Sequence, residues 1–362
     1  MTTTQPPART GPRSDGAPPP GTTLGFDRTV PRATAHRRQV GEVFVTDSAQ
    51  VGPDDFHLAF EVLRAHSLWS DRGGSAYHDP LASAEAARQG IFVLLHRHVG
   101  IPVELPFSLQ RIALRVEDPA AYLNDRRTAL RGTIHFRVTE RTGRGAEVTA
   151  LSLHGTVRIA ERRAMTLTTN LVFMSQEDYD VFRSFQRAQK PVASAVRTPA
   201  GPLPPAAVGR ELPANVVIGT VHGGGGAAHG GVGDERRLVL TADTTHPAFF
   251  DHDYDHVPGP LMVEGMRQAA LHAVGDPTAP GGARAHLAVG CEAAFLDFVE
   301  FEADVDYRTS VGATTADGRT PVDVVIRQFD RDVVTGRVEL LPDPAAPPRT
   351  STSTPPVPAY GD

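Results

Sequence analysis

A glutamate and an arginine three residues apart stand in an otherwise apolar stretch, PLMVEGMRQAALHAVG. Glu264 and Arg267 would lie on one face of a helix, because residues at i and i+3 are neighbours on a helix surface. A buried charge is costly unless it is paired or hydrogen-bonded. The pair therefore indicates either an internal ion pair that fixes packing or a site that uses a carboxylate and a guanidinium.

The same Glu-x-x-Arg-Gln spacing occurs earlier in the chain. AEAARQGIFVLLH carries Glu85, Arg88 and Gln89, and the later copy, VEGMRQAALHAVG, continues into Gln268. His66 lies 19 residues before the first glutamate of this motif, and His246 lies 18 residues before the second. Duplication explains the match. It does not decide between packing and chemistry, because a copied fold also copies its structural pairs.

A loop with several histidines precedes the second motif. HPAFFDHDYDHVPG adds His252 and His256 and ends in a Pro-Gly turn at Gly259. Histidine titrates near neutral pH and suits proton transfer. Backbone amides at the start of a helix can hold a thioester oxygen or a phosphate. Two alternatives stay open: solvated loop histidines, and a zinc site that includes Asp251, although the ligand spacing is irregular.

These residues need helices and strands to position them. Apolar residues at helical spacing predict a helix that starts at Pro80 and stops before Gly100, and a second helix starts near Pro260. QEDYDVFRSFQ predicts a short closing helix. Strands are predicted in GEVFVTD, FHLAFEVL, LPFSLQRIALRV, ALRGTIHFRVTE, EVTALSLHGTVRIA, MTLTTNLVFM, RRLVLTAD, LDFVEFEADVDYRTS, PVDVVIRQF and TGRVELLP.

The chain divides into two similar halves. We predict repeats over residues 39–189 and 235–341, with a flexible Pro/Gly/His-rich linker over residues 190–234. Residues 1–38 and 342–362 are poor in apolar residues and are predicted to be disordered tails. A long apolar helix against antiparallel strands is the α+β hotdog plan. Two copies predict a tandem double hotdog that forms an intramolecular pseudo-dimer.

Composition narrows the class of protein. The 362 residues are 40% hydrophobic and 22% charged, typical of a soluble globular protein. The net charge of −6 disfavours nucleic acid as a partner. The chain has no apolar stretch of bilayer-spanning length and no secretory signal, which disfavours a membrane partner. Cys291 is the one cysteine, which excludes an internal disulfide and fits a cytoplasmic location.

Two resemblances follow from these motifs. FFDHDYDHVPGPLMVEGMRQ resembles hotdog acyl-carrier-protein dehydratases, in which a loop histidine and a helix glutamate act on a 3-hydroxyacyl thioester. AHSLW, HDPLASAEAARQG, THPAFFDHDYDHVPG and EGMRQAA more closely resemble the A-factor biosynthesis family. That resemblance implies a synthase that joins a 3-oxoacyl chain on acyl carrier protein to dihydroxyacetone phosphate. The resulting ester closes to a butenolide phosphate on the way to a γ-butyrolactone autoinducer.

The resemblance implies a role for the Glu and Arg of both repeats. We expect Glu264 or Glu85, helped by His252 or His256, to take the proton of the attacking hydroxyl. The oxyanion would rest on amides near Gly259. We expect substrate or phosphate binding by the guanidinium and amide side chains of Arg267, Arg88, Gln268 and Gln89. His66 and His246 are further loop candidates. The chemistry needs no metal and no cofactor. The alternatives are a dehydratase or hydratase and a non-catalytic acyl-binding regulatory module.

Overall fold

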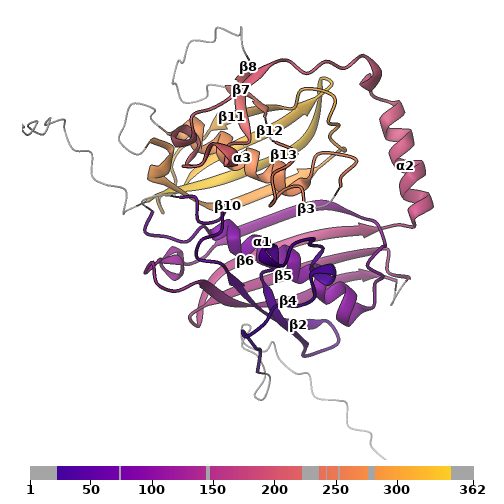
Figure 1. Cartoon of the computed structure of the whole chain (residues 1–362), viewed down its shortest axis with the longest axis vertical. Helices are drawn as coiled ribbons and strands as arrows, with labels where there is room; N and C mark the ends of the chain where they lie inside the picture. Colours follow the sequence, from indigo (N-terminus) through magenta and orange to yellow (C-terminus); the bar gives the residue numbers. More distant parts are fainter. Residues whose placement is uncertain are drawn as a thin grey trace, which may run out of the picture.

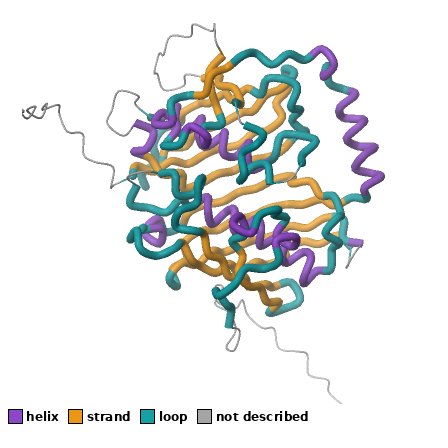
Figure 2. The backbone as a smooth tube through the Cα atoms, in the orientation of Figure 1, coloured by secondary structure: helices purple, strands orange, loops and turns teal. Residues whose placement is uncertain are grey.

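A single antiparallel sheet runs through the molecule. The computed structural model describes residues 23–72, 75–143, 147–221, 236–241, 243–251, 253–275 and 282–343. Within these residues the sheet has 13 strands in the order β1-β2-β4-β5-β6-β3-β10-β13-β12-β11-β9-β8-β7. Two long helices, α1 and α3, lie on one face of it, one helix over each half (Figure 1, Figure 2). This is the expected tandem double hotdog.

The elements of the two halves follow the same order along the chain. The first half contains β1 (Val45–Gln50), β2 (Asp55–Val62), α1 (Pro80–Leu94), β3 (Phe107–Val116), β4 (Leu130–Thr142), β5 (Ala150–Ile159) and β6 (Arg162–Phe173). The second contains β7 (Ala200–Pro202), β8 (Ile218–Val221), β9 (Arg236–Leu240), α3 (Gly259–Val274), β10 (His286–Phe295), β11 (Asp306–Val311), β12 (Thr320–Gln328) and β13 (Arg331–Pro342). Helix α2 (Gln176–Ala188) connects the halves.

Short helical segments complete the described chain. A π-helical segment, η3 (Leu95–Val99), extends α1. The remaining segments are 3-10 helices: η1 (Arg32–Ala35), η2 (Val40–Glu42), η4 (Pro119–Tyr122), η6 (Val192–Ser194), η7 (Pro205–Val208), η8 (Pro213–Asn215) and η9 (Gly282–Ala285). In the described part of the chain, no helix has both the length and the hydropathy to span a membrane.

Strands β3 and β10 join the two halves. They pair antiparallel, with Leu114 opposite Cys291 and Arg115 opposite Gly290. Among the described strands, every other pairing stays within one half, so this one ladder joins the six-stranded sheet of the first half to the seven-stranded sheet of the second. The backbone groups at the inner edge of each sheet are thereby hydrogen-bonded instead of exposed. The prediction that the repeats dock into one body is confirmed.

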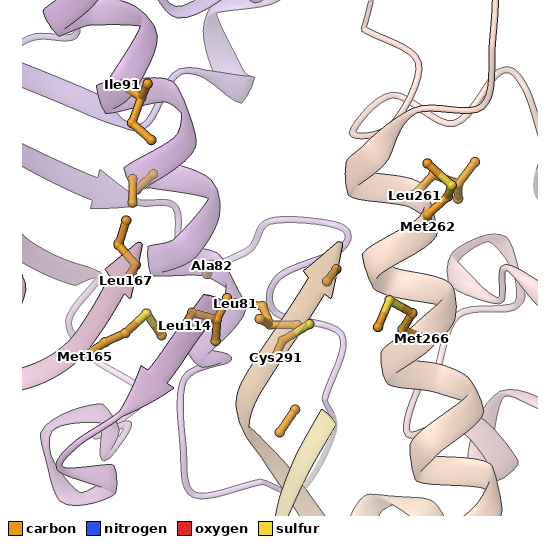
Figure 3. Close-up of a cluster of buried hydrophobic side chains, with 14 of the residues drawn as sticks. Leu81, Ala82, Ile91, Leu114, Met165, Leu167, Leu261, Met262, Met266 and Cys291 are labelled. Carbon is orange, nitrogen blue, oxygen red and sulfur yellow. The ribbon is translucent and has the colours of Figure 1, made fainter. Parts of the chain in front are cut away.

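The core lies between the sheet and the two helices. Side chains from both helices point toward the strands at the junction, among them Leu81 and Met266 (Figure 3). Helix α1 is buried along almost its whole length, which explains its lack of a polar face. The Asp79 side chain accepts a hydrogen bond from the Leu81 amide and starts this helix at Pro80, as predicted. Full burial of each leucine contributes about 1.5–3 kcal/mol.

The predicted strands of the second half need a correction. Strand β10, which has the sequence HLAVGCEAAF and stands at the junction, was not predicted. A strand was predicted over all of LDFVEFEADVDYRTS, whereas the observed strand is Asp306–Val311. Alanine and glycine have weak strand propensity, so nothing local marks β10. Its strand conformation comes from ladders with a neighbour on each side, β3 and β13.

The predicted tail and linker also need a correction. Residues 23–38 and 190–221 are part of the folded molecule: they contain η1, β7, η7, η8 and β8, and they place Arg37 and Arg210 in the interior. Pro-rich composition suggested flexible chain, but proline also suits 3-10 turns and an edge strand such as β7. At the other end, β13 runs to Pro342 and Asp343 is buried. The His/Gly-rich residues 222–234 lie outside the described residues.

Candidate active site

A cavity of about 550 Å³ lies at the boundary between the two repeats. Helix α1, strands β3 and β6, helix α2 and the start of α3 surround it. Its polar lining includes Arg88, Tyr179, Tyr254, Asp255 and His256. Apolar side chains line most of the rest, including Ala84, Ala87, Ile91, Phe92, Phe107, Leu109, Ile112, Leu114, Leu167, Leu171, Met262 and Phe295. Such a cavity suits a ligand with an apolar chain and an anionic or hydrogen-bonding end.

Arg88 presents a fixed positive charge to this cavity. Its Nε donates to Glu85 Oε2 at 2.8 Å and its Nη2 donates to Glu85 Oε1 at 3.0 Å. The guanidinium carbon lies 5.1 Å from the centre of the Phe92 ring. The side chain keeps 21% of its surface exposed. A guanidinium held on one edge and open on the other can bind a phosphate or carboxylate bidentately.

Glu85 holds Arg88 in place. This buried carboxylate also accepts hydrogen bonds from Arg37 and from Gln89 Nε2, the latter at 2.9 Å. Burial alone would raise the pKa of Glu85, but Arg37 and Arg88 outweigh it and lower the pKa to about 2. A carboxylate that stays ionised and fully hydrogen-bonded is a poor acceptor for a substrate proton. The geometry supports a positioning role for Glu85, not the expected role as a base.

The second repeat has the same kind of cluster around Glu264, but here the arginine of the motif is buried as well. Glu264 accepts from Arg210 Nη2 and Arg267 Nη2, each at 2.8 Å, and from Gln268 Nε2 at 2.6 Å. Arg267 also pairs with Asp79. Burial alone would raise the pKa of Glu264, but Arg210 and Arg267 outweigh it and lower it. The Arg267 side chain is only 3% exposed, so this pair does not face a solvent-filled cleft.

The two glutamines of the motif hold backbone, not ligand. Gln89 is buried; its Oε1 accepts from the Phe44 amide at 2.8 Å and its Nε2 donates to the Glu42 carbonyl at 2.8 Å. Gln268 accepts from the Val217 amide at 2.9 Å and donates to the Asn215 carbonyl at 2.7 Å. Their side chains are occupied in this way and do not line the cavity. The expected substrate-binding role of both is not supported.

The positions of Arg37 and Arg210 beside the two glutamates were not predicted. Both lie in segments assigned to a tail and a linker, yet each pairs with the motif glutamate of its own repeat. A signal was available: residues 31–45, PRATAHRRQVGEVFV, match residues 204–218, PPAAVGRELPANVVI, without a gap, and the two arginines coincide. The match is short and rich in proline and alanine, which hides it between the stronger helix motifs.

The two loop histidines that precede the motifs are structural. His66 Nε2 lies 3.1 Å from Glu42 Oε2, and His246 Nε2 lies 2.9 Å from Asn215 Oδ1. The Nδ1 atom of each accepts a backbone amide of its own loop. Both rings are buried away from the cavity lining, and burial lowers the pKa of His246. They fix the loops that lead into the helices.

His36, which was not predicted, lines the cavity, and of the predicted loop histidines that the structure describes, His256 lines it. Its Nδ1 lies 2.5 Å from Asp255 Oδ1. Asp255 also accepts from Arg183 Nε at 2.9 Å and from the Tyr179 hydroxyl at 3.1 Å. Burial alone would raise the pKa of Asp255, but His256 and Arg183 outweigh it and lower the pKa far below its usual range. An ionised carboxylate at Nδ1 orients the ring and leaves Nε2 as the nitrogen for proton transfer.

The start of helix α3 completes the site. Gly259 lines the cavity, and the preceding residue, Pro258, makes no side-chain cap to the first-turn amides. Such amides carry partial positive charge and can donate hydrogen bonds to a developing oxyanion. His252 lies outside the described residues. Among those described, no three His, Cys, Asp or Glu side chains are grouped to hold a metal ion.

The continuous sheet, the paired helices and a cavity at the repeat boundary define a tandem hotdog protein. The chain belongs to the A-factor biosynthesis hotdog family, whose domain matches residues 22–175 and 192–342. The 2-oxo-3-(phosphooxy)propyl 3-oxoalkanoate synthase of Streptomyces virginiae is 32% identical over 70% of this chain and 79% of that protein. The synthase of the same name from Streptomyces coelicolor is 28% identical over 83% of this chain and 87% of that protein.

Solved structures with a similar arrangement include the 12:0-ACP thioesterase from Umbellularia californica. It is 14% identical, and the match covers 80% of this chain and 94% of that chain with a TM-score of 0.46.

Proposed function

We propose that this protein is a γ-butyrolactone-type autoinducer synthase. It transfers a 3-oxoacyl group from a thioester to the primary hydroxyl of dihydroxyacetone phosphate. The product is the ester that closes to a butenolide phosphate. Family membership and the names of the relatives support this reaction. The observation that carries the proposal is one cavity that combines an apolar lining with Arg88, His256 and Gly259.

The apolar and the polar parts of the cavity lining bind different parts of the substrates. The acyl chain lies along the apolar side chains of α1, β3 and β6, where burial of each methylene contributes about 0.8 kcal/mol. The phosphate of the acceptor binds Arg88, whose orientation Glu85 fixes. Arg37 holds the other side of Glu85 and so keeps this carboxylate ionised. The acceptor's hydroxyl is thereby fixed beside the thioester carbonyl.

The transfer needs one base and one oxyanion site. His256 Nε2 accepts the hydroxyl proton while the hydroxyl oxygen attacks the thioester carbon. Asp255 stabilises the imidazolium through Nδ1. The carbonyl oxygen takes the negative charge and is stabilised by the Gly259 amide. When the tetrahedral intermediate collapses, the carbon–sulfur bond breaks, and the thiolate takes the proton from His256 and leaves as a thiol.

We propose acyl carrier protein as the carrier of the acyl chain and the cytoplasm as the location. The test is to incubate purified protein with 3-oxoacyl carrier protein and dihydroxyacetone phosphate and to identify products by mass spectrometry. Unphosphorylated dihydroxyacetone is the matched control, and it should react at least tenfold more slowly. Release of free 3-oxo acid without an ester would contradict the synthase, as would dehydration of a 3-hydroxyacyl thioester.

The dehydratase alternative has less support. It needs Glu264 as a free acid or base, and this carboxylate is buried among Arg210, Arg267 and Gln268 outside the cavity lining. A binding module without turnover would bind both substrates in the same assay and yield no ester.

A further inference from the structure

The two repeats create two pseudo-equivalent places for chemistry. Glu85, Arg88 and Gln89 correspond to Glu264, Arg267 and Gln268 at a constant offset of 179 positions. In each place, the motif arginine of one helix lies toward the start of the other helix. In the first place, Arg88 of α1 lines the cavity together with Gly259 at the start of α3. In the second place, Arg267 of α3 pairs with Asp79 at the start of α1.

Asp79 distinguishes the two places. At the same offset Asp79 corresponds to Pro258, so the second place has a carboxylate where the first has none. One oxygen of Asp79 accepts the Leu81 amide at 3.0 Å, and the other accepts Nη1 of Arg267. Asp79 and Arg267 are both buried, and the Asp79 carboxylate occupies the place beside Arg267 that a substrate anion would take. The guanidinium that could bind a substrate anion is already neutralised by an anion of the protein.

Two more positions also make the second place less suited to the proposed chemistry than the first. Gly259 corresponds to Pro80, which has no backbone N–H and cannot donate to an oxyanion. His256 corresponds to Tyr77, so a tyrosine stands in the second place where the first has its histidine. A smaller cavity of about 230 Å³ lies on that side. Tyr77, His78 and three arginines, Arg64, Arg72 and Arg126, are among its lining residues, but neither Arg267 nor Glu264 lines it.

We propose that the chain has one working site, formed by Arg88 and the start of α3, and that Asp79 closes its pseudo-equivalent. The cluster of Asp79, Arg267, Glu264 and Arg210 is then a structural element that holds the two repeats together. This inference rests on the proposed function, because it names which copy of the site binds the phosphorylated acceptor. Asp79 is a closing residue and takes no part in the reaction.

Binding stoichiometry tests the inference independently of turnover. Isothermal titration of the full chain with dihydroxyacetone phosphate should give one molecule per chain, and Arg88→Gln should weaken binding at least tenfold. If this binding pattern holds but no ester forms, the proposed reaction fails and the inference survives. Two molecules per chain in the wild type would overturn the inference. The inference would also be overturned if Arg88→Gln still bound one molecule per chain, for instance in the arginine-lined smaller cavity. It would be overturned as well if Arg88→Gln kept half of the turnover.

A second arm tests the role of Asp79. In an Arg88→Gln background, Asp79→Ala removes the internal anion and leaves Arg267 ready to take an external one. Inorganic phosphate should then raise the melting temperature by several degrees relative to chloride at equal ionic strength. Arg88→Gln alone, the matched control, should not respond. If the double variant does not fold, Asp79→Asn keeps the side-chain volume and serves in its place. Equal responses with and without Asp79 would overturn the closing role.

Discussion

Arg267 of helix α3 and Asp79 at the start of helix α1 form a buried ion pair across the boundary between the two repeats. The two residues are 188 positions apart in the sequence. Arg267 also binds Glu264, which pairs with Arg210 as well, so two guanidinium groups and two carboxylates form one buried cluster. Arg88, its counterpart in the first repeat, binds one carboxylate and faces a cavity. This contrast predicts different effects for the same substitution.

Arg267→Gln should destabilise the protein strongly. The substitution leaves the Asp79 carboxylate buried without its charged partner, and breaking such a pair costs on the order of 3–5 kcal/mol. The free energy of unfolding, from urea titrations followed by circular dichroism, measures the loss. Arg88→Gln is the matched control and should lose less than half as much, because its side chain is partly exposed. Equal losses in the two variants would contradict the structural role of Arg267.

His256→Gln should reduce turnover with little effect on folding. Removal of a general base lowers kcat by roughly 10²–10⁴-fold, and the His256 side chain is not part of the buried core. Asp255→Asn should reduce kcat less, because it removes the group that orients the ring and keeps the ring itself. Steady-state kinetics of ester formation, with a circular dichroism melt for each variant, provide the measurement. A fully active His256→Gln would remove His256 from the mechanism.

The pH dependence of stability should show the contribution of Glu85. Its pKa is lowered to about 2 in the folded protein from 4.5. A lowered carboxyl pKa stabilises the fold above the unfolded-state value, and this stabilisation is lost as pH falls from about 4.5 toward about 2. The contribution is on the order of 3 kcal/mol. The gap in unfolding free energy between wild type and Glu85→Gln should therefore narrow between pH 6 and pH 3. A gap that stays constant would show that Glu85 is not held ionised.

Ala84→Leu should shorten the acyl chain that the enzyme accepts. Ala84 lies on α1 and lines the cavity, and leucine keeps the helix while it adds bulk on the ligand side. The ratio kcat/KM should fall about tenfold for long 3-oxoacyl chains, since a lost contact of about 1.4 kcal/mol changes a rate tenfold, and should change little for short ones. Val263→Leu, at the corresponding position of α3, is the control. The proposed placement of the chain fails if both variants keep the wild-type length profile.

The sequence predicted the elements whose signals are local. The helix that begins at Pro80 was predicted from apolar spacing, a proline at its start and a glycine after its end. The charged motif was located on both helices for the same reason. What was missed depends on partners far along the chain. Arg37 reaches Glu85 from 48 positions away, and β10 becomes a strand between β3 and β13. No window of sequence contains such pairs.

The roles of the motif residues were also beyond local reasoning. Whether a glutamate on an apolar helix acts as a base depends on how many cations surround it. Arg37 and Arg88 occupy Glu85, and Arg210 and Arg267 occupy Glu264, so both carboxylates anchor arginines. The sequence alone does not distinguish His256 from His66 and His246. The fold distinguishes them, because the loop of His256 borders the cavity.

The ladder between β3 and β10 joins two unlike halves of one polypeptide. In a homodimer of identical subunits, every substitution appears on both sides of the two-fold axis, so a residue that blocks one site blocks the other. Covalent linkage removes that constraint. A carboxylate at position 79 alters one half alone, and the corresponding proline at 258 leaves the other half free for ligand. Fusion therefore allows one copy to specialise in holding the molecule together while its twin retains the chemistry.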